Sequence, residues 1–167
     1  MATTKFKGTE VELLGTEINV GDKAPAITVV NSDGLGDVTV GGAQGHKQLI
    51  IVVPSLDTGV CATETRNFNS KASSLNGVKP TIVSLDLPFA AGRFCSTEGI
   101  NDLTVTSDFR NKDFANAYGV LLGGSVLAGV TCRAIFVVNE EGVVTYKEIV
   151  PEITEEPDYD AAIAAVS

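Results

Sequence analysis

Residues 49–61 read LIIVVPSLDTGVC, an apolar run that leads through a proline and a turn to a cysteine. The run at residues 49–53 is continuous and rich in β-branched side chains, which is typical of a strand buried on both faces. Residues 61–77 are mostly polar, with apolar side chains at helical spacing and Gly77 as the expected stop. We therefore predict a buried strand, a turn, and a helix whose first turn contains Cys61.

Further elements are predicted on both sides of this stretch. Alternating apolar and polar residues around a glycine predict a small hairpin at residues 6–14. A short strand ends at the turn residues NSDG, and residues 37–40 can pair back on it. Downstream we predict strands at 81–88, 103–108, 132–138 and 143–150, helices at 111–119 and 156–166, an irregular or briefly helical segment at 95–100, and a glycine-punctuated connection at 120–131.

The order of these elements predicts the fold class. Buried strands alternate with helices in the middle of the chain, which implies a central parallel pair, and the last two strands add an antiparallel hairpin. This order is that of an α/β domain with a thioredoxin-like fold and an N-terminal β-hairpin extension. We expect residues 1–167 to form one domain, because the sequence shows no linker, low-complexity tract or internal repeat.

Composition excludes several classes of function. The 167 residues are 44% hydrophobic and 20% charged, as in ordinary globular proteins. The formal net charge of −9 argues against nucleic-acid binding, which needs clustered Lys and Arg. No apolar run is long enough to span a membrane, and the N-terminus lacks an apolar signal core. We expect a cytoplasmic protein.

The cysteines point to redox chemistry. Cys61, Cys95 and Cys132 cannot all pair within one chain, and none lies in a CxxC motif. With one histidine, His46, in a polar stretch, no metal site is expected. Without a secretion signal, thiols are more typical of redox chemistry than of a disulfide framework. The alternative for each cysteine is an inert, buried, small hydrophobic residue.

The position of Cys61 favours reactivity. Unpaired N–H groups in the first turn of a helix carry partial positive charge, which stabilises a thiolate relative to a thiol. The pKa of a free cysteine, about 8.5, can fall by one to several units at such a place or beside a cation. Since the thiolate is the nucleophile, placement alone gives Cys61 a reason to react.

Three neighbours strengthen this interpretation. The hydroxyl of Thr58 could fold back toward the sulfur or a bound oxygen, and Pro54 would shield the turn. Arg133 begins the segment CRAIFVV and would reach Cys61 if that strand lies next to residues 49–53. The alternatives are an ordinary turn residue for Thr58 and a surface ion pair for Arg133.

Three separated segments carry a family resemblance. Residues 54–61, PSLDTGVC, have the Pro-x-x-x-Thr-x-x-Cys pattern of peroxiredoxins. Residues 86–95, DLPFAAGRFC, and 152–164, EITEEPDYDAAIA, resemble the thiol peroxidase branch of the bacterial atypical two-cysteine peroxiredoxins. The similarity runs over essentially the whole chain, and three motifs in order make it specific.

The resemblance implies a thioredoxin-dependent peroxidase without a cofactor. Cys61 would be the peroxidatic cysteine, with Thr58 and Arg133 polarising the peroxide and Pro54 shielding it. Cys95 would be the resolving cysteine, forming a Cys61–Cys95 disulfide that thioredoxin reduces. Hydrogen peroxide and alkyl or lipid hydroperoxides would be the substrates, and the protein would be an antioxidant homodimer.

Cys132 departs from the pattern, since a small apolar residue is expected before Arg133. Adjacent residues of a strand point to opposite faces, so Cys132 should face away from Cys61 if Arg133 faces it. We expect Cys132 to be buried and inert. Its presence nevertheless leaves two cysteines, Cys95 and Cys132, as candidates for the disulfide partner of Cys61.

Two other functions remain compatible with these thiols. A redox-switched interaction protein would use Cys61 and Cys95 to change a binding surface, but it would not need Arg133 or Thr58. A noncatalytic thioredoxin-like scaffold would require Cys61 to be unreactive.

Overall fold

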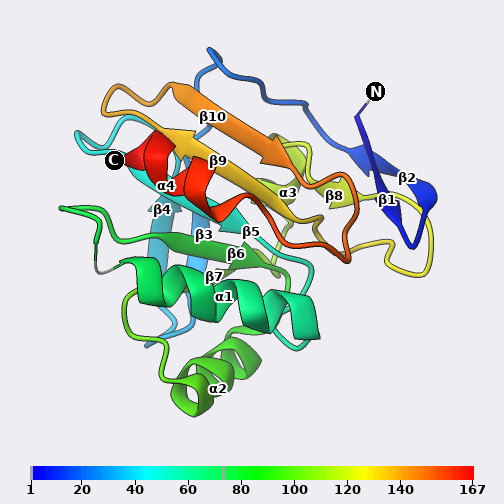
Figure 1. Ribbon diagram of the computed structural model, residues 1–167, viewed down its shortest axis with the longest axis horizontal. Helices are drawn as coiled ribbons and strands as arrows, with labels where there is room; N and C mark the ends of the chain where they lie inside the picture. Colours follow the sequence, from blue (N-terminus) through cyan, green and yellow to red (C-terminus); the bar gives the residue numbers. More distant parts are fainter. Residues whose placement is uncertain (1, 73) are drawn as a thin grey trace.

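A seven-stranded sheet forms the centre of the molecule in the computed structural model, which describes residues 2–72 and 74–167 (Figure 1). Its strand order is β10-β9-β5-β6-β7-β3-β4. The strands are β3 (Ile27–Asn31), β4 (Asp37–Val40), β5 (Gln48–Val52), β6 (Thr81–Ser84), β7 (Thr104–Ser107), β9 (Ala134–Val138) and β10 (Val144–Ile149). Strands β5, β6 and β7 are parallel neighbours, whereas β9 pairs antiparallel with β5 and β10 antiparallel with β9. The predicted parallel centre and terminal hairpin are confirmed.

A second, small sheet contains the N-terminal extension. Strands β1 (Thr3–Phe6) and β2 (Thr9–Leu14) form the predicted hairpin, and β2 also pairs with the two-residue strand β8 (Leu121–Leu122). The hairpin turns at Lys7 and Gly8, both with positive φ. Strand β8 lies in the connection that the sequence predicted only as glycine-punctuated.

The helices cover both faces of the large sheet. Helices α1 (Gly59–Ala72) and α4 (Tyr159–Val166) lie in front of it in Figure 1, α2 (Pro88–Glu98) lies below α1 at the lower end of the molecule, and the short α3 (Asp113–Ala117) lies behind. Phe68 of α1 and Val166 of α4 belong to one apolar core, whereas Phe114 of α3 packs in the other. This arrangement, with the N-terminal hairpin in its own sheet, is the predicted thioredoxin-like fold.

The central strands separate these two cores by simple alternation. Along β5, Leu49 and Ile51 belong to the core under α1, while Ile50 and Val52 belong to the core on the α3 side. Successive side chains of a strand point to opposite faces, so a strand with apolar residues at every position is buried on both. Residues 49–53 are all buried, as the opening stretch predicted, and β5 itself begins one residue earlier, at Gln48.

Helix α2 is the main difference from the sequence prediction, which made residues 95–100 irregular or briefly helical and extended the preceding strand to residue 88. Strand β6 ends at Ser84, and Pro88 is instead the first residue of an eleven-residue helix. Proline suits this position because the N–H that it lacks would be unpaired there. Gly99 ends the helix in the left-handed conformation, so Cys95 lies within a regular helix.

Other boundaries differ by a few residues. Helix α1 ends at Ala72 rather than near Gly77, and residue 73 lies outside the described residues. Beyond it, the N–H of Leu75 bonds to the carbonyl of Ala72 in a tighter turn. At α4 the N-cap is Asp158, whose carboxylate accepts from the N–H of Ala161. Pro157 therefore precedes the cap instead of lying in the first turn.

Candidate active site

Thr58 caps the helix that carries Cys61. Its hydroxyl accepts a hydrogen bond from the Cys61 N–H at 3.2 Å and donates one to the Ser55 carbonyl at 3.1 Å. Its own carbonyl accepts from the N–H of Ala62. This is the local reason that a helix starts after the turn, because a threonine hydroxyl satisfies an N–H of the first turn. Among the hydrogen bonds of the described residues, the hydroxyl makes none to the sulfur itself.

Asp86, in the connection between β6 and α2, holds the turn before Cys61 in place. The carboxylate of Asp86 accepts a hydrogen bond from the Ser55 hydroxyl at 2.7 Å and another from the Leu56 N–H at 2.8 Å. Pro54, two residues after the end of β5, is buried. Sequence reasoning missed Asp86, although an acidic residue closely following a buried strand was a usable signal.

Arg133 reaches the sulfur of Cys61, as expected for neighbouring strands. It directly precedes β9, and β9 pairs with β5, whose end leads to the Cys61 turn. Its Nη1 lies 3.1 Å from Cys61 Sγ, and its Nε donates to the Ile153 carbonyl at 2.8 Å. Arg133 is 2% exposed and Cys61 is 0% exposed. The predicted approach is confirmed, and the surface ion pair is excluded.

Glu64 is a second acidic partner of Arg133 that the sequence reasoning missed. Its Oε2 lies 2.7 Å from the same Nη1, whereas its buried Oε1 has no hydrogen-bond partner among the described residues. Burial raises the pKa of the Glu64 carboxyl to about 7, although the charge of Arg133 lowers it. A carboxylate on the buried stripe of α1, three residues after Cys61, was the available signal.

The guanidinium of Arg133 remains charged in this buried position. Burial lowers the pKa of Arg133, but the attraction of Cys61 and Glu64 outweighs it, so the net shift is upward. A buried cation is stable only when it is paired, and these two side chains supply the pairing.

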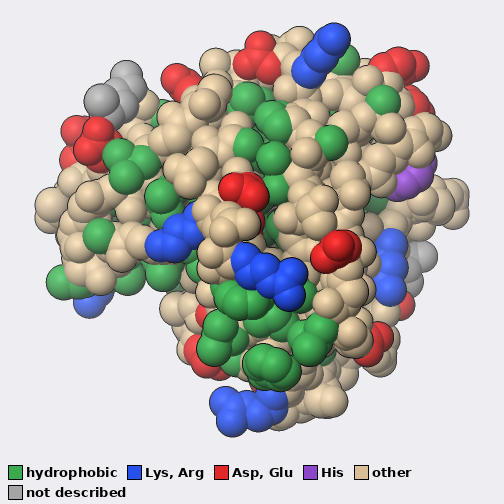
Figure 2. Space-filling view, turned by 180° about the vertical axis from the view of Figure 1, so that it is seen from behind, with side chains coloured by type: hydrophobic (Ala, Val, Ile, Leu, Met, Phe, Trp, Pro, Cys, Tyr) green, Lys and Arg blue, Asp and Glu red, His purple; other side chains and the backbone are tan. Residues whose placement is uncertain are grey.

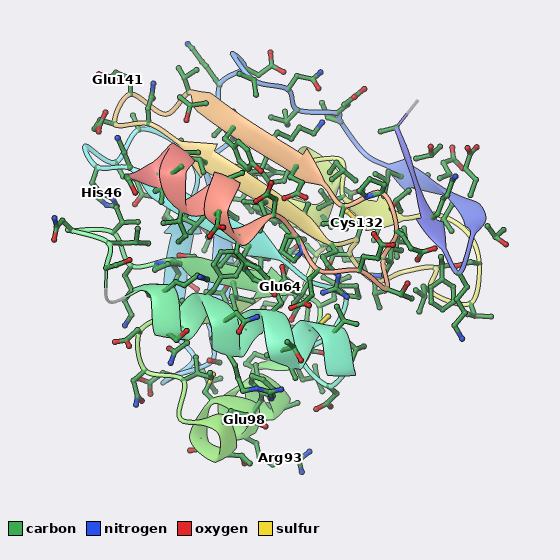
Figure 3. The ribbon with its side chains drawn as sticks, in the orientation of Figure 1. His46, Glu64, Arg93, Glu98, Cys132 and Glu141 are labelled. Atoms are coloured by element: carbon green, nitrogen blue, oxygen red, sulfur yellow. The ribbon has the colours of Figure 1, made fainter. Side chains whose placement is uncertain are left out.

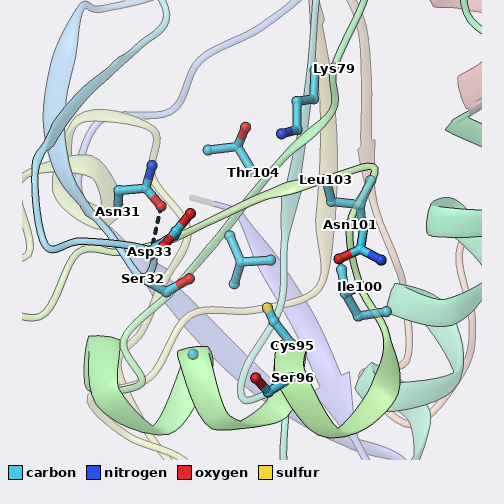
Figure 4. Close-up of a pocket in the computed structure, with 12 residues that line it drawn as sticks. Asn31, Ser32, Asp33, Lys79, Cys95, Ser96, Ile100, Asn101, Leu103 and Thr104 are labelled. Atoms are coloured by element: carbon cyan, nitrogen blue, oxygen red, sulfur yellow. Dashed lines mark hydrogen bonds between the residues drawn. The ribbon is translucent and has the colours of Figure 1, made fainter.

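Cys95 lies away from this cluster, against a cavity of about 360 Å³ (Figure 4). The cavity lies between α2 and the β3–β4 connection, with Ser32, Asp33 and Lys79 in its lining. The Cys95 thiol is half-buried and is not part of a disulfide. Burial raises the pKa of Cys95, while a hydrogen bond with the Ser32 side chain lowers it. The structure therefore contains no bond between Cys61 and Cys95.

Cys132 lies on the other face of the sheet. It is 0% exposed and belongs to the core on the α3 side, whereas Cys61 belongs to the core under α1. Burial raises the pKa of the Cys132 thiol to about 12, so it is neutral at physiological pH. The expectation that Cys132 faces away from Cys61 is confirmed.

No group of three or more His, Cys, Asp or Glu side chains among the described residues could hold a metal ion. No helix in the same part of the chain is long and apolar enough to cross a membrane.

Comparison with known proteins defines the family. The redoxin family model matches residues 19–163. A thiol peroxidase of Aquifex aeolicus is 50% identical over 164 residues, covering 98% of this chain and 96% of the relative. A thiol peroxidase of Campylobacter jejuni is 52% identical over 158 residues, covering 95% and 89% respectively.

Solved structures agree with this assignment. The crystal structure of a peroxiredoxin-like protein from Aquifex aeolicus matches with a TM-score of 0.95 at 49% identity, covering 99% of this chain and 96% of the other. A thiol peroxidase from Chromobacterium violaceum matches with a TM-score of 0.85 at 23% identity, covering 95% and 91% of the two chains, which shows the shared fold.

The fold and these relatives define a peroxiredoxin of the redoxin class. Within it, the chain belongs to the thiol peroxidase family and is an oxidoreductase of that kind.

Proposed function

We propose that Cys61 is the peroxidatic cysteine of this enzyme. The observation that carries the proposal is the 3.1 Å contact between Arg133 Nη1 and Cys61 Sγ at the first turn of α1. The cation and the helix terminus both favour the thiolate. Its sulfur attacks one peroxide oxygen, so that an S–O bond forms, the O–O bond breaks, and the leaving oxygen departs with a proton as water or an alcohol.

The surrounding groups stabilise the reacting oxygens. Arg133 and the N–H groups at the start of α1 supply positive charge where negative charge develops on the leaving oxygen. Thr58 positions the Cys61 backbone, and Pro54 covers the turn from the core side. Since Cys61 is 0% exposed and Thr58 is exposed, peroxide enters by a small displacement of this turn.

We propose that Cys95 resolves the sulfenic acid. Its thiol attacks the Cys61 sulfur, a disulfide forms, and water leaves. Because Cys95 lies within α2 and against a separate cavity, α2 must unwind locally for the two sulfurs to meet. An external dithiol then reduces the disulfide by exchange, and we propose thioredoxin for this role on the strength of the family resemblance.

The proposed substrates are hydrogen peroxide and alkyl or lipid hydroperoxides. Three thiols outside any disulfide suit a reducing compartment, so we propose the cytoplasm.

We also propose a homodimer. Apolar side chains gather at the end of the molecule that carries α2 (Figure 2), where Leu87 is 55% exposed and Phe89 is 72% exposed. Exposed apolar patches of this kind are often covered by a partner. Analytical sedimentation tests the homodimer by comparing the mass in solution of the wild type with that of Phe89→Glu.

The decisive experiment measures peroxide consumption with thioredoxin, thioredoxin reductase and NADPH. Wild type turns over many equivalents of peroxide, Cys61→Ser turns over none, and Cys95→Ser loses one thiol quickly and then stops. A single stoichiometric oxidation of the wild type, in the presence of the reductant, would instead support a redox-switched interaction protein.

A further inference from the structure

One nitrogen of Arg133 donates hydrogen bonds to two acidic side chains, Cys61 and Glu64. Nη1 donates to Cys61 Sγ at 3.1 Å and to Glu64 Oε2 at 2.7 Å, and the remaining described contact of the guanidinium is the neutral carbonyl of Ile153. All three side chains are buried, with Cys61 and Glu64 0% exposed and Arg133 2% exposed. If both acids were ionised, the cluster would contain two negative charges and one positive charge in a low-dielectric site.

Such a cluster favours one retained proton. Two anions that share one cation repel each other, and a buried net charge is costly, so their titrations are coupled. The second carboxyl oxygen adds to this effect, because Oε1 is buried without a hydrogen-bond partner among the described residues. An unpaired buried oxygen costs more on a charged carboxylate than on a neutral carboxylic acid.

The other charged and titratable groups around Glu64 act in the same direction. Glu148 on β10 and Glu156 before α4 each raise the pKa of Glu64 by repulsion, and the charge of Glu64 in turn helps to raise the pKa of Tyr159 on α4, after burial and a hydrogen bond with Glu156. In Figure 3, Glu64 lies between α1 and the sheet, where these elements meet. Arg133 is the cation among these groups, and it is the group that Cys61 also needs.

We propose that Glu64 is a proton-linked positioning residue that competes with Cys61 for Arg133. When the carboxyl of Glu64 holds the proton, the charge of Arg133 stabilises the Cys61 thiolate. When Glu64 ionises, it neutralises Arg133 and favours the neutral thiol. The protonation state of Glu64 thus sets how much of the Arg133 charge is available to the nucleophile.

This inference rests on the proposed role of Cys61, but its test does not depend on turnover. The reduced protein is titrated by thiolate absorbance, with Cys95→Ser and Cys132→Ala as background in every variant. Glu64→Gln keeps an oxygen for Arg133 and removes the competing charge. We expect the midpoint of its thiolate titration to fall by about one pH unit, which is about a tenfold change in the thiolate-to-thiol ratio. Glu141→Gln, which removes an equal charge at the distant β9–β10 turn (Figure 3), should leave the midpoint unchanged.

Linkage makes the coupling reciprocal, which gives a second measurement. The carbonyl band of protonated Glu64, identified in the infrared spectrum by its loss in Glu64→Gln, should titrate at lower pH in Cys61→Ser by the same amount. If Glu64→Gln does not fold, the shift of this band in Glu64→Asp identifies it instead, and the wild-type and Cys61→Ser spectra are compared as before. The proposal is overturned if the midpoint of the thiolate titration stays or rises in Glu64→Gln. It is also overturned if the carboxyl band titrates at the same pH in Cys61→Ser as in the wild type. Loss of peroxide turnover in the wild type would overturn the proposed function alone.

Discussion

Cys132 and Arg133 are neighbours in the chain but lie on opposite faces of the central sheet. The thiol of Cys132 packs in the core beside α3, whereas the guanidinium of Arg133 contacts the Cys61 sulfur under α1. A two-residue alternation therefore separates the buried thiol of Cys132 from the cation that contacts the Cys61 sulfur.

Cys132 should be dispensable for peroxide reduction. We expect Cys132→Ala to consume peroxide within about twofold of wild type and to lose about 1 kcal/mol of unfolding free energy, because it leaves a small cavity. In the native wild type, an alkylating reagent at pH 8 should leave Cys132 unmodified and should modify it after unfolding. Peptide mass mapping checks both points, and a Cys61–Cys132 disulfide after one equivalent of peroxide would contradict this assignment.

Thr58 should contribute through its hydroxyl. Thr58→Val keeps the shape of the side chain but loses the acceptor for the Cys61 N–H. We expect about 1 kcal/mol lower unfolding free energy and slower oxidation of Cys61 in stopped flow. Thr58→Ser restores the acceptor and should recover both. Equal oxidation rates for all three proteins would make Thr58 an ordinary turn residue.

Arg133 should be needed for the chemistry as well as for stability. Arg133→Met leaves the Glu64 carboxyl buried without its cation, so we expect a loss of about 3 kcal/mol of unfolding free energy. Peroxide reduction should fall about 100-fold, as when one stabilising donor is removed from an active site. The double variant Arg133→Met/Glu64→Gln should regain stability in urea titrations without regaining rate. Recovery of the rate in that variant would reduce Arg133 to a structural role.

Local unwinding of α2 should limit disulfide formation. Arg93 is exposed near the middle of this helix (Figure 3), so Arg93→Gly and Arg93→Ala remove the same side chain and differ in helix propensity. Glycine weakens a helix by about 1 kcal/mol relative to alanine. We expect the Cys61–Cys95 disulfide to form up to about fivefold faster in Arg93→Gly, which rapid-quench mass analysis measures. The same rate in both variants would place the slow step elsewhere.

Glu64 should make stability fall as the pH rises from 4.5 to about 7. Its folded pKa is raised, so between these values the folded protein keeps a proton that the unfolded chain has lost, and folding binds protons. The stabilisation is complete below the unfolded pKa and is lost as the pH passes the folded pKa. Urea unfolding at pH 4.5 and pH 8 should show a loss of about 3 kcal/mol that Glu64→Gln lacks. An identical pH dependence in the variant would show that Glu64 is ionised throughout.

The sequence by itself determined the elements whose signals are local. The β-branched run of β5, the helix start with Cys61 in its first turn, and the turn residues of the final hairpin each act over a few residues. Backbone sterics and burial on both faces are enough to specify them. The alternation at Cys132 and Arg133 is equally local, and it predicted correctly that Cys132 faces away from Cys61 when Arg133 faces it.

Only the tertiary structure decided which distant groups meet. Glu64 is separated from Arg133 by 69 residues, and Asp86 from Ser55 by 31, so neither contact has a local signature. Helix α2 was missed because Pro88 ends a strand pattern as readily as it begins a helix, and packing of Ala91 against the core decides between them. The site depends on β9 lying beside β5. That pairing joins residues far apart in the sequence and is favoured because it buries both strands on two faces. It places the buried Arg133 next to both Cys61 and Glu64.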